Sequence, residues 1–359
     1  MTMPRAGDVT TIGNGSAVVA FDVGGTDLKA GLIDEHGVLI ELLREPSPSG
    51  PETAALVIDR VAELTEHFRG AHPELRIAGL GLVVPGVVDE VAGIGVESEN
   101  LGWVEVPFRD LVAARTGLPV AFLHDVRAAG EAEHRIGAAA GHDDVVVLVI
   151  GTGIAGAVFI NGELYAGGGF AGEIGHSIVD PDGPPCLCGG RGCLEAIGSA
   201  GAITRLYNAR TGSNATGAKA VLAAAADGDQ AAVDVWERAL DALALGLAQL
   251  TAVIAPRAIV IGGGLASAGD ALFTPLTERL DALLTFHRRP VLIPARLGED
   301  AGLCGAALRA RDAAAAAHAA PATSPATSPA TSPATTSPAN SSATTPSTTP
   351  STTEPEVGP

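Results

Sequence analysis

One local pattern occurs twice in this 359-residue chain, and it restricts the fold more than any other feature. In each copy an apolar strand ends in a break of glycine and threonine, a second strand follows, and a turn leads to a third strand. The predicted strands are 16–22, 28–33 and 38–43 in the first copy, and 145–150, 154–160 and 163–165 in the second. The sequence therefore predicts an α/β protein with two similar domains and a cleft between them.

Helices and strands alternate after each copy of the pattern. After the first copy we expect helix 51–68, strand 76–84, a loop, helix 109–116, strand 119–123 and helix 126–137. After the second copy we expect helix 229–254, strand 257–261, helix 267–284, strand 291–293 and helix 301–317. This order predicts a smaller domain over residues 17–125, completed by a final helix at 300–317, and a larger domain over residues 126–299.

Composition restricts the core, the partners and the location of the protein. Hydrophobic residues make up 47% of the chain but aromatic residues only 3%, so aliphatic side chains must fill the core. A formal net charge of −19 repels nucleic-acid phosphates, so we expect no nucleic-acid partner. We recognise neither a signal peptide nor a membrane-spanning segment, and we expect a cytoplasmic protein with reduced thiols. Residues 319–359, mainly Ala, Thr, Ser and Pro, are predicted to be a disordered tail that is dispensable for activity.

The densest group of potential metal ligands lies in residues 173–195. Cys186, Cys188 and Cys193 fall within eight residues of each other, and His176 precedes them. Three thiolates and one imidazole suit tetrahedral Zn²⁺. Because four protein ligands leave no open position and the segment is rich in Gly and Pro, we expect a structural zinc ion that stabilises a loop.

Both Gly/Thr breaks are candidate phosphate-binding turns. Glycine lets backbone N–H groups approach phosphate oxygens, and a threonine hydroxyl adds a donor. Asp22 precedes the first turn and suits Mg²⁺ or its water, and Gly262 to Gly264 form a third glycine turn suited to a nucleotide. Asp125 follows a predicted strand and precedes a helix. It either caps that helix or accepts a proton from a substrate hydroxyl in the cleft.

The chain resembles the ROK family of sugar kinases and sugar-responsive repressors over about residues 17–312. The resemblance rests on motifs in a fixed order, namely Asp22 to Thr26, Pro85-Gly86, Asn100 to Trp103, Asp125, Gly151 to Gly153, Glu173 to Glu195 and Gly262 to Gly264. The Cys/His segment is the most specific of these motifs. The resemblance implies a two-domain actin/hexokinase-type (ribonuclease H-like) ATPase fold, with ATP, catalytic Mg²⁺ and structural Zn²⁺, and a homodimer.

The resemblance also implies a role for each candidate residue. Asp125 would be the catalytic base that removes a proton from a sugar hydroxyl, most often the 6-hydroxyl, as the oxygen attacks the γ-phosphate of ATP. The implied sugar-binding residues are Asn100, His124, Asp125, Glu173, His176, which also binds zinc, and Glu195. The implied phosphate- and nucleotide-binding residues are Asp22, Gly24, Gly25, Thr26, Gly151, Thr152, Gly153, Gly262 and Gly263. His124 stands where the family usually has Asn, which leaves the preferred sugar open.

Several functions are consistent with this resemblance. Phosphorylation of glucose to glucose 6-phosphate is the first expectation, phosphorylation of N-acetylmannosamine or N-acetylglucosamine is the alternative, and fructose and allose stay open. A sugar-sensing regulator without catalysis is a second class, against which the retained Asp125 and both turns argue. A DNA-binding repressor is disfavoured, because fewer than 20 residues precede the first predicted strand and the charge is acidic. ATP is favoured over polyphosphate as the donor, because the polyphosphate-using relatives lack this cysteine cluster.

Overall fold

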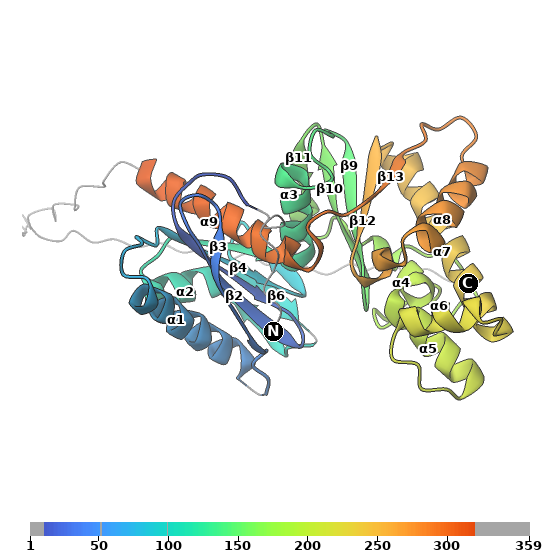
Figure 1. Ribbon diagram of the computed structural model, residues 1–359, viewed down its shortest axis with the longest axis horizontal. Coiled ribbons are helices and arrows are strands. Elements are labelled where there is room, and N and C mark those ends of the chain that lie inside the picture. Colours follow the sequence, from blue (N-terminus) through green and yellow to red (C-terminus); the bar gives the residue numbers. More distant parts are fainter. Residues whose placement is uncertain (1–10, 51, 99, 320–359) are drawn as a thin grey trace, which may run out of the picture. The chain divides into compact units, whose positions relative to one another are not determined.

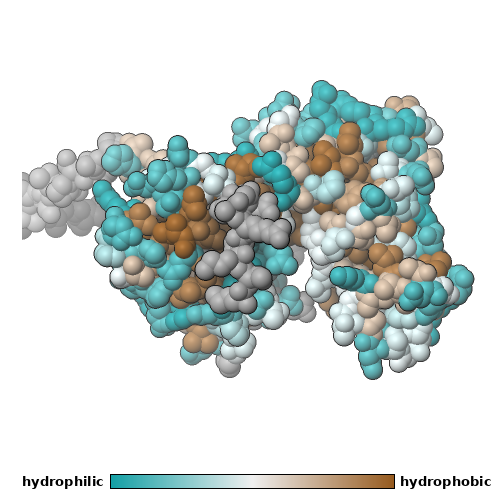
Figure 2. Space-filling model, in the orientation of Figure 1, coloured by the Kyte–Doolittle hydropathy of each residue, from teal (hydrophilic) through white to brown (hydrophobic). Residues whose placement is uncertain are grey.

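The structure is a computed structural model of the chain, and it describes residues 11–50, 52–98 and 100–319 (Figure 1). The predicted tail, from residue 320 on, lies outside the described residues. Among the helices of the described part, none combines the length and the apolar character that crossing a membrane requires. The visible face in Figure 2 is largely hydrophilic along its outline, with smaller hydrophobic areas between.

The first repeat of the sequence supplies three strands of a five-stranded mixed sheet. β1 (Val18–Val23), β2 (Asp27–Ile33) and β3 (Leu39–Pro46) are the predicted antiparallel meander. β4 (Gly79–Val84) pairs parallel with β1, and β8 (Val120–His124) pairs parallel with β4. The strand order is β3-β2-β1-β4-β8.

Helices cover both faces of this sheet (Figure 1). α1 (Thr53–Ala71) and α2 (Phe108–Thr116) contribute to the apolar core on one face. α9 (Ala301–Ala319) packs on the other face, against β1, β4 and β8. A Cβ at Gly81 of β4 would lie 2.0 Å from the backbone oxygen of Ala306, so glycine is what permits the helix backbone to approach the strand.

The second repeat forms an equivalent sheet. β9 (Val145–Ile150), β10 (Ile154–Ile160) and β11 (Glu163–Tyr165) are antiparallel, and β12 (Ala258–Gly262) and β13 (Val291–Pro294) are parallel to β9. The order β11-β10-β9-β12-β13 repeats that of the first sheet with the same strand directions. The repeat in the sequence is therefore a repeat of topology, and the predicted α/β class is confirmed.

Helices of the second half lie on both faces of its sheet. The long α7 (Gln230–Ile254) begins at Asp229, whose side chain accepts hydrogen bonds from the N–H groups of Ala231 and Ala232. α7 packs against α8 (Asp270–Leu283) and contributes to the core with β9 and β12. Three shorter helices in this half were not predicted from the sequence, namely α4 (Leu194–Gly198), α5 (Ala200–Thr211) and α6 (Ala218–Ala226).

α3 (Asp125–Ile136) is the helix that contacts both sheets. It packs against β8 of the first sheet, against β9 and β10 of the second, and against α9. Small residues make this possible. A Cβ at Gly305 of α9 would lie 2.0 Å from the backbone oxygen of Ala128, and one at Gly130 would lie 2.3 Å from the Cβ of Ala157. The first residue of α3 therefore lies close to elements of both halves.

The segment predicted as a loop after Pro85-Gly86 is instead a small antiparallel sheet. It consists of β5 (Val87–Asp89), β6 (Ile94–Ser98) and β7 (Trp103–Val106). Each strand is too short for its apolar alternation to stand out in the sequence. The sheet is stabilised by contacts that the local pattern does not contain, such as the edge-to-face packing of Trp103 on Phe108 of α2.

Candidate functional site

Asp125 lies at the junction of β8 and α3. His124 occupies the position before the helix and Asp125 is its first residue, so the interpretation of Asp125 as the helix cap is wrong. The Asp125 Oδ1 atom accepts a hydrogen bond of 2.6 Å from the Val126 N–H. Surrounding protein atoms raise the pKa of Asp125 to about 6, although 33% of its side chain stays exposed. The carboxylate is therefore accessible and ionised at neutral pH, as a general base must be.

A cavity of about 220 Å³ brings Asp125 together with residues from four other parts of the chain. Asp22, at the end of β1, and Glu133, on α3, line it, as do Gly262 and Gly263 after β12. Burial, together with the negative charges of Asp125 and Asp300, raises the pKa of Asp22 to about 6, against the opposing effect of Lys29. Carboxylates that face one cavity form an oxygen-rich environment that a divalent cation would compensate, and this donor set fits Mg²⁺.

The two Gly/Thr turns are closed hairpins with exposed threonines. In the first turn the Gly24 N–H donates to the Asp27 backbone oxygen, and the Thr26 side chain is exposed. In the second turn the Gly151 N–H donates to the Gly153 backbone oxygen, and Thr152 is exposed. Gly25 is also exposed. In the described part of the chain, none of these turn residues lines the cavity that contains Asp22 and Asp125.

The four predicted metal ligands lie together. His176 is the last residue of the short 3₁₀ helix η2 (Ile174–His176), and the ligand atoms of His176, Cys186, Cys188 and Cys193 are all within 4.8 Å of one another. The Cys188 and Cys193 sulfur atoms are 3.8 Å apart, too far for a disulfide bond. Three thiols and one imidazole at this spacing fit the donor set of a closed tetrahedral zinc site.

The two ring nitrogens of His176 face different groups. Its Nδ1 atom is 3.7 Å from the Cys186 sulfur, and its Nε2 atom is 4.0 Å from a carboxylate oxygen of Glu173. One nitrogen thus faces the metal ligands while the other faces a predicted sugar-binding residue. Such an arrangement lets a metal fix the orientation of a substrate-binding side chain.

The other predicted sugar-binding residues lie in separate surroundings. The Glu195 Oε2 atom accepts a 2.8 Å hydrogen bond from the Ile154 N–H, next to the second Gly/Thr turn. Asn100 is exposed in the turn between β6 and β7. The His124 Nε2 atom is 3.3 Å from Asp125 Oδ1. Burial, and secondarily the charge of Arg127, lower the pKa of His124 to about 4, so the imidazole is neutral at physiological pH.

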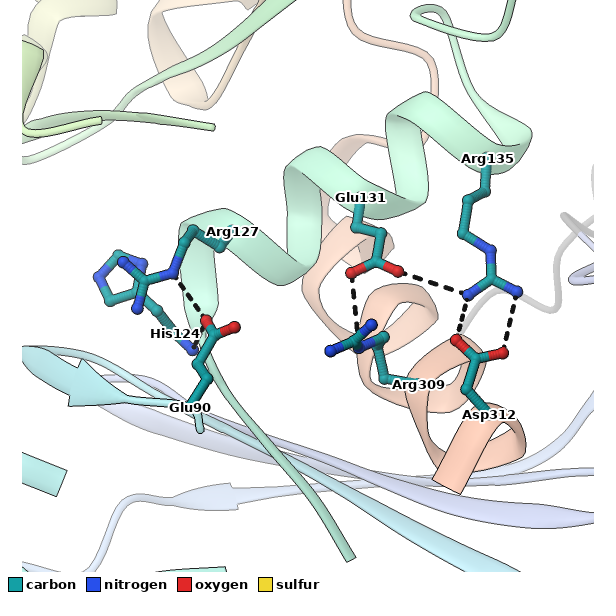
Figure 3. Close-up of polar contacts among 7 residues, drawn as sticks. All are labelled: Glu90, His124, Arg127, Glu131, Arg135, Arg309 and Asp312. Atoms are coloured by element: carbon teal, nitrogen blue, oxygen red, sulfur yellow. Dashed lines mark hydrogen bonds and ion pairs between the residues drawn. The ribbon is translucent and has the colours of Figure 1, made fainter. Parts of the chain in front are cut away.

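Three charged residues around Asp125 were not predicted from the sequence, namely Glu90, Arg127 and Glu133. Glu90 accepts hydrogen bonds from the His124 N–H and from Arg127 (Figure 3). Glu133, also on α3, accepts hydrogen bonds from the backbone N–H groups of three residues, Ala138, Arg296 and Leu297. No local signal marked Arg127 and Glu133, because α3 also carries Glu131 and Arg135 and the partners of both residues include groups distant in the sequence.

Comparison with known proteins identifies relatives over most of the chain. The model of the ROK family matches residues 18–313. A glucokinase of Thermotoga maritima is 36% identical over 309 residues, which cover 81% of this chain and 96% of the relative. An N-acetylmannosamine kinase of Escherichia coli is 32% identical over 298 residues, which cover 82% of this chain and 98% of the relative.

A solved structure has the same fold. The ROK family glucokinase of Streptomyces griseus, determined in complex with glucose and AMPPNP, is 32% identical and superposes with a TM-score of 0.68. The match covers 83% of this chain and 100% of that structure. The predicted actin/hexokinase-type fold is therefore confirmed.

Proposed function

Because this chain belongs to the ROK family, we propose that it is an ATP-dependent sugar kinase that converts glucose to glucose 6-phosphate. The observation that carries the proposal is the position of the Asp125 carboxylate. Its side chain is 33% exposed and lines the same cavity as Asp22, Gly262 and Gly263. The sequence similarity to a named glucokinase supports the choice of glucose.

The proposed mechanism uses Asp125 as the base. The sugar 6-hydroxyl donates a hydrogen bond to the carboxylate and transfers its proton as the oxygen attacks the γ-phosphorus of ATP, with ADP as the leaving group. A carboxyl group with a pKa of about 6 is ionised at neutral pH and is a stronger base than an ordinary aspartate. His124, which is neutral and lies 3.3 Å from Asp125, would orient the carboxylate or the sugar.

The nucleotide would be held by groups from both halves. The backbone N–H groups and hydroxyls of the turns at 24–26 and 151–153 would bind the phosphates, and Gly262 and Gly263 would lie near the adenosine. Asp22 would hold Mg²⁺ or its water. When bound, Mg²⁺ supplies positive charge that stabilises the phosphates.

The four potential zinc ligands, His176, Cys186, Cys188 and Cys193, are called the zinc-type cluster. This cluster would fix the orientation of residues in the sugar site. Glu173, His176 and Glu195 would bind sugar hydroxyls, with Asn100 contacting further ones. The two-sided placement of the His176 ring supports this proposal, because a metal on its Nδ1 side would fix the Nε2 side that faces Glu173. The expected homodimer and cytoplasmic location stay predictions.

Phosphorylation of N-acetylmannosamine is the second candidate. It is favoured by the similarity to a named N-acetylmannosamine kinase, at 32% identity over nearly the whole of that protein. His124, immediately before the proposed base, is the residue to test for a role in this choice.

The test is a coupled kinase assay with ATP against glucose, mannose, N-acetylglucosamine, N-acetylmannosamine, fructose and allose. The proposal expects the highest kcat/KM with glucose and loss of turnover in Asp125→Asn. A preference for an N-acetylated sugar supports the second candidate. Sugar binding without turnover by the wild-type protein, measured by calorimetry, supports a non-catalytic regulator and contradicts the kinase.

A further inference from the structure

Arg127 is an almost completely buried charged side chain near the proposed base. It lies on the first turn of α3, two residues after Asp125, and is 2% exposed. All three of its guanidinium nitrogens donate hydrogen bonds. The Nε atom donates to Glu90 Oε1 at 2.7 Å (Figure 3). The two terminal nitrogens donate to the backbone oxygens of Gly169 at 3.0 Å and Val88 at 3.2 Å.

A guanidinium in this position determines the arrangement of its surroundings. Removing a charge from water is costly unless hydrogen-bonding partners replace the water, so the partners of Arg127 must stay in place. Lysine cannot replace it, because an ammonium group does not reproduce the planar arrangement of donors that reaches three separate acceptors. The interaction is therefore specific in geometry as well as in charge.

The partners of Arg127 come from two segments that are distant in the sequence. Val88 lies in β5 and Glu90 follows that strand, whereas Gly169 ends the 3₁₀ helix η1 (Gly167–Gly169). A Cβ at Gly169, which has a φ of +97°, would lie 2.8 Å from the Val88 backbone oxygen. Arg127 and this close approach together hold η1 against β5.

The same loop is attached to the second sheet at its other end. The Gly156 N–H of β10 donates to the Gly172 backbone oxygen at 2.8 Å, and a Cβ at Gly172 would lie 1.9 Å from the Gly156 oxygen. Glu173 follows directly, and His176 three residues later. The backbone that leads into the proposed sugar-binding residues is thus fixed at two points, of which Arg127 is one.

Glu90 connects this arrangement to the base. Its Oε1 atom accepts both from Arg127 and, at 3.1 Å, from the backbone N–H of His124, the residue before Asp125. One carboxylate oxygen thus links the start of α3 to the guanidinium that holds the loop.

We propose that Arg127, through Glu90 and Gly169, is a positioning residue that sets Glu173 and His176 relative to Asp125 for sugar phosphorylation. The inference rests on the proposed function for its catalytic meaning, whereas the anchoring of the loop is independent of it. Displacement of a bound substrate by about 1 Å can lower a rate about 10²-fold, so a loosened loop affects both sugar binding and turnover. In the described part of the chain Arg127 donates its hydrogen bonds to Glu90, Gly169 and Val88 and not to either Gly/Thr turn. The KM for ATP is therefore expected to stay within about twofold of wild type, a change of roughly 0.4 kcal/mol.

α3 offers a matched control at its other end. Arg135 pairs with Asp312 of α9 through contacts of 2.7 and 3.3 Å, and with Glu131, in the second group of side chains in Figure 3. It is an arginine of the same helix in a more exposed ion pair, away from η1. Arg135→Lys therefore tests the effect of weakening an ion pair on α3 without releasing the loop.

The experiment compares Arg127→Lys, Glu90→Gln and Arg135→Lys by amide hydrogen exchange of residues 167–173 without ligands, and by steady-state kinetics with sugar and ATP. We expect faster exchange in Arg127→Lys and Glu90→Gln, a sugar KM raised about tenfold and a lower kcat, with Arg135→Lys close to wild type. The tenfold figure corresponds to the loss of about 1.4 kcal/mol. Glu90→Gln, which keeps an acceptor oxygen, serves if Arg127→Lys does not fold.

Hydrogen exchange and kinetics together distinguish the positioning role of Arg127 from the proposed kinase function. Unchanged exchange of residues 167–173 in both variants overturns the positioning role, whether or not a sugar is phosphorylated. Equal increases in the KM for sugar and for ATP, or the same changes in Arg135→Lys, also overturn it. Faster exchange in the variants of a wild-type protein that phosphorylates none of the sugars overturns the proposed function and leaves the loop anchor in place.

Discussion

The two Gly/Thr turns occupy the same place in two sheets of the same topology, yet their chemical surroundings differ. The next-to-last residue of β1 is Asp22, which pairs across the strands with Lys29. At the same position of β9 stands Val149, which pairs with Ala155. The first turn is thus flanked by charged residues and the second by apolar ones.

The second turn receives its carboxylate from elsewhere in the chain. Glu195, at the start of α4, accepts a hydrogen bond from the Ile154 N–H, and a Cβ at Gly153 would lie 2.5 Å from its Oε2 atom. In the first half the carboxylate belongs to the strand, whereas in the second it comes from the segment that carries the zinc-type cluster. The repeat therefore places the turns, while residues outside it determine their chemistry.

The residues that follow the last strand of each sheet also differ in charge. β8, the last strand of the first sheet, leads into Asp125, whereas β13, its counterpart, ends at Pro294 and leads into Ala295. We infer that the first half supplies the carboxylates for proton transfer and Mg²⁺, and that the second supplies neutral donors and the sugar-binding loop.

The largest expected effect comes from the carboxylate of the first half. Asp125→Asn removes the base but keeps the side-chain shape, so we expect kcat to fall about 10²- to 10⁴-fold. Glucose binding, measured by calorimetry, should persist. Asp110→Asn, an exposed position on α2, is the control and should keep wild-type kcat. A kcat within threefold of wild type in Asp125→Asn, a change of about 0.65 kcal/mol in the barrier, would rule out this role.

Next comes the zinc-type cluster of the second half. Cys188→Ser is expected to lower zinc content and to raise the sugar KM about 10- to 100-fold, because His176 loses its fixed orientation. The KM for ATP should change less. Zinc content is measured by atomic absorption, and Cys304→Ser, in α9, is the control. A loss of zinc with an unchanged sugar KM would show that the metal does not order the sugar site.

The pH dependence tests the first half again. Burial raises the pKa values of Asp125 and Asp22 to about 6. The proposed roles as base and Mg²⁺ ligand need both carboxylates ionised, so we expect activity above pH 6 and its loss as the pH falls through 6. We expect kcat/KM to fall about tenfold per pH unit below 6 if one group controls it, and more steeply if both do. A flat profile from pH 7.5 down to pH 5 would contradict the raised pKa of the base.

The smallest expected effect separates the two turns. Thr26→Val and Thr152→Val each remove one hydroxyl donor, worth about 1 kcal/mol, so each should raise the KM for ATP about fivefold. Because Asp22 lies beside the first turn, only Thr26→Val should also raise the Mg²⁺ concentration needed for half-maximal rate. Thr277→Val, on the exposed face of α8, is the control. Identical Mg²⁺ dependence in both variants would show that the turns are chemically equivalent.

Local patterns were sufficient for most of the fold. The second meander has the predicted bounds throughout, because Gly151 to Gly153 interrupt its apolar run and Asn161-Gly162 marks the turn. The strands β5, β6 and β7 were missed because three to five residues carry too little periodicity. The helices α4 to α6 were missed because they follow the cysteine segment without a clear apolar repeat.

Some residues of the candidate site could likewise be predicted from the sequence, and others could not. His176 and the three cysteines lie within one short segment, so their spacing indicated a metal site before any fold was known. Arg127 could not be recognised, because its partners Glu90 and Gly169 are 37 and 42 residues away. Nothing in the local sequence marks an arginine on an amphipathic helix as buried.

The sequence by itself determined the family, the repeated strand pattern and the group of metal ligands, because each depends on residues close together in the chain. Only the tertiary structure decided that Asp22 and Asp125 face one cavity. Their strands, β1 and β8, are separated in sequence and are joined through β4 in a parallel arrangement, which brings their carboxyl ends to one edge of the sheet. Pairing between distant strands is set by the burial of their side chains, and no local pattern contains that information.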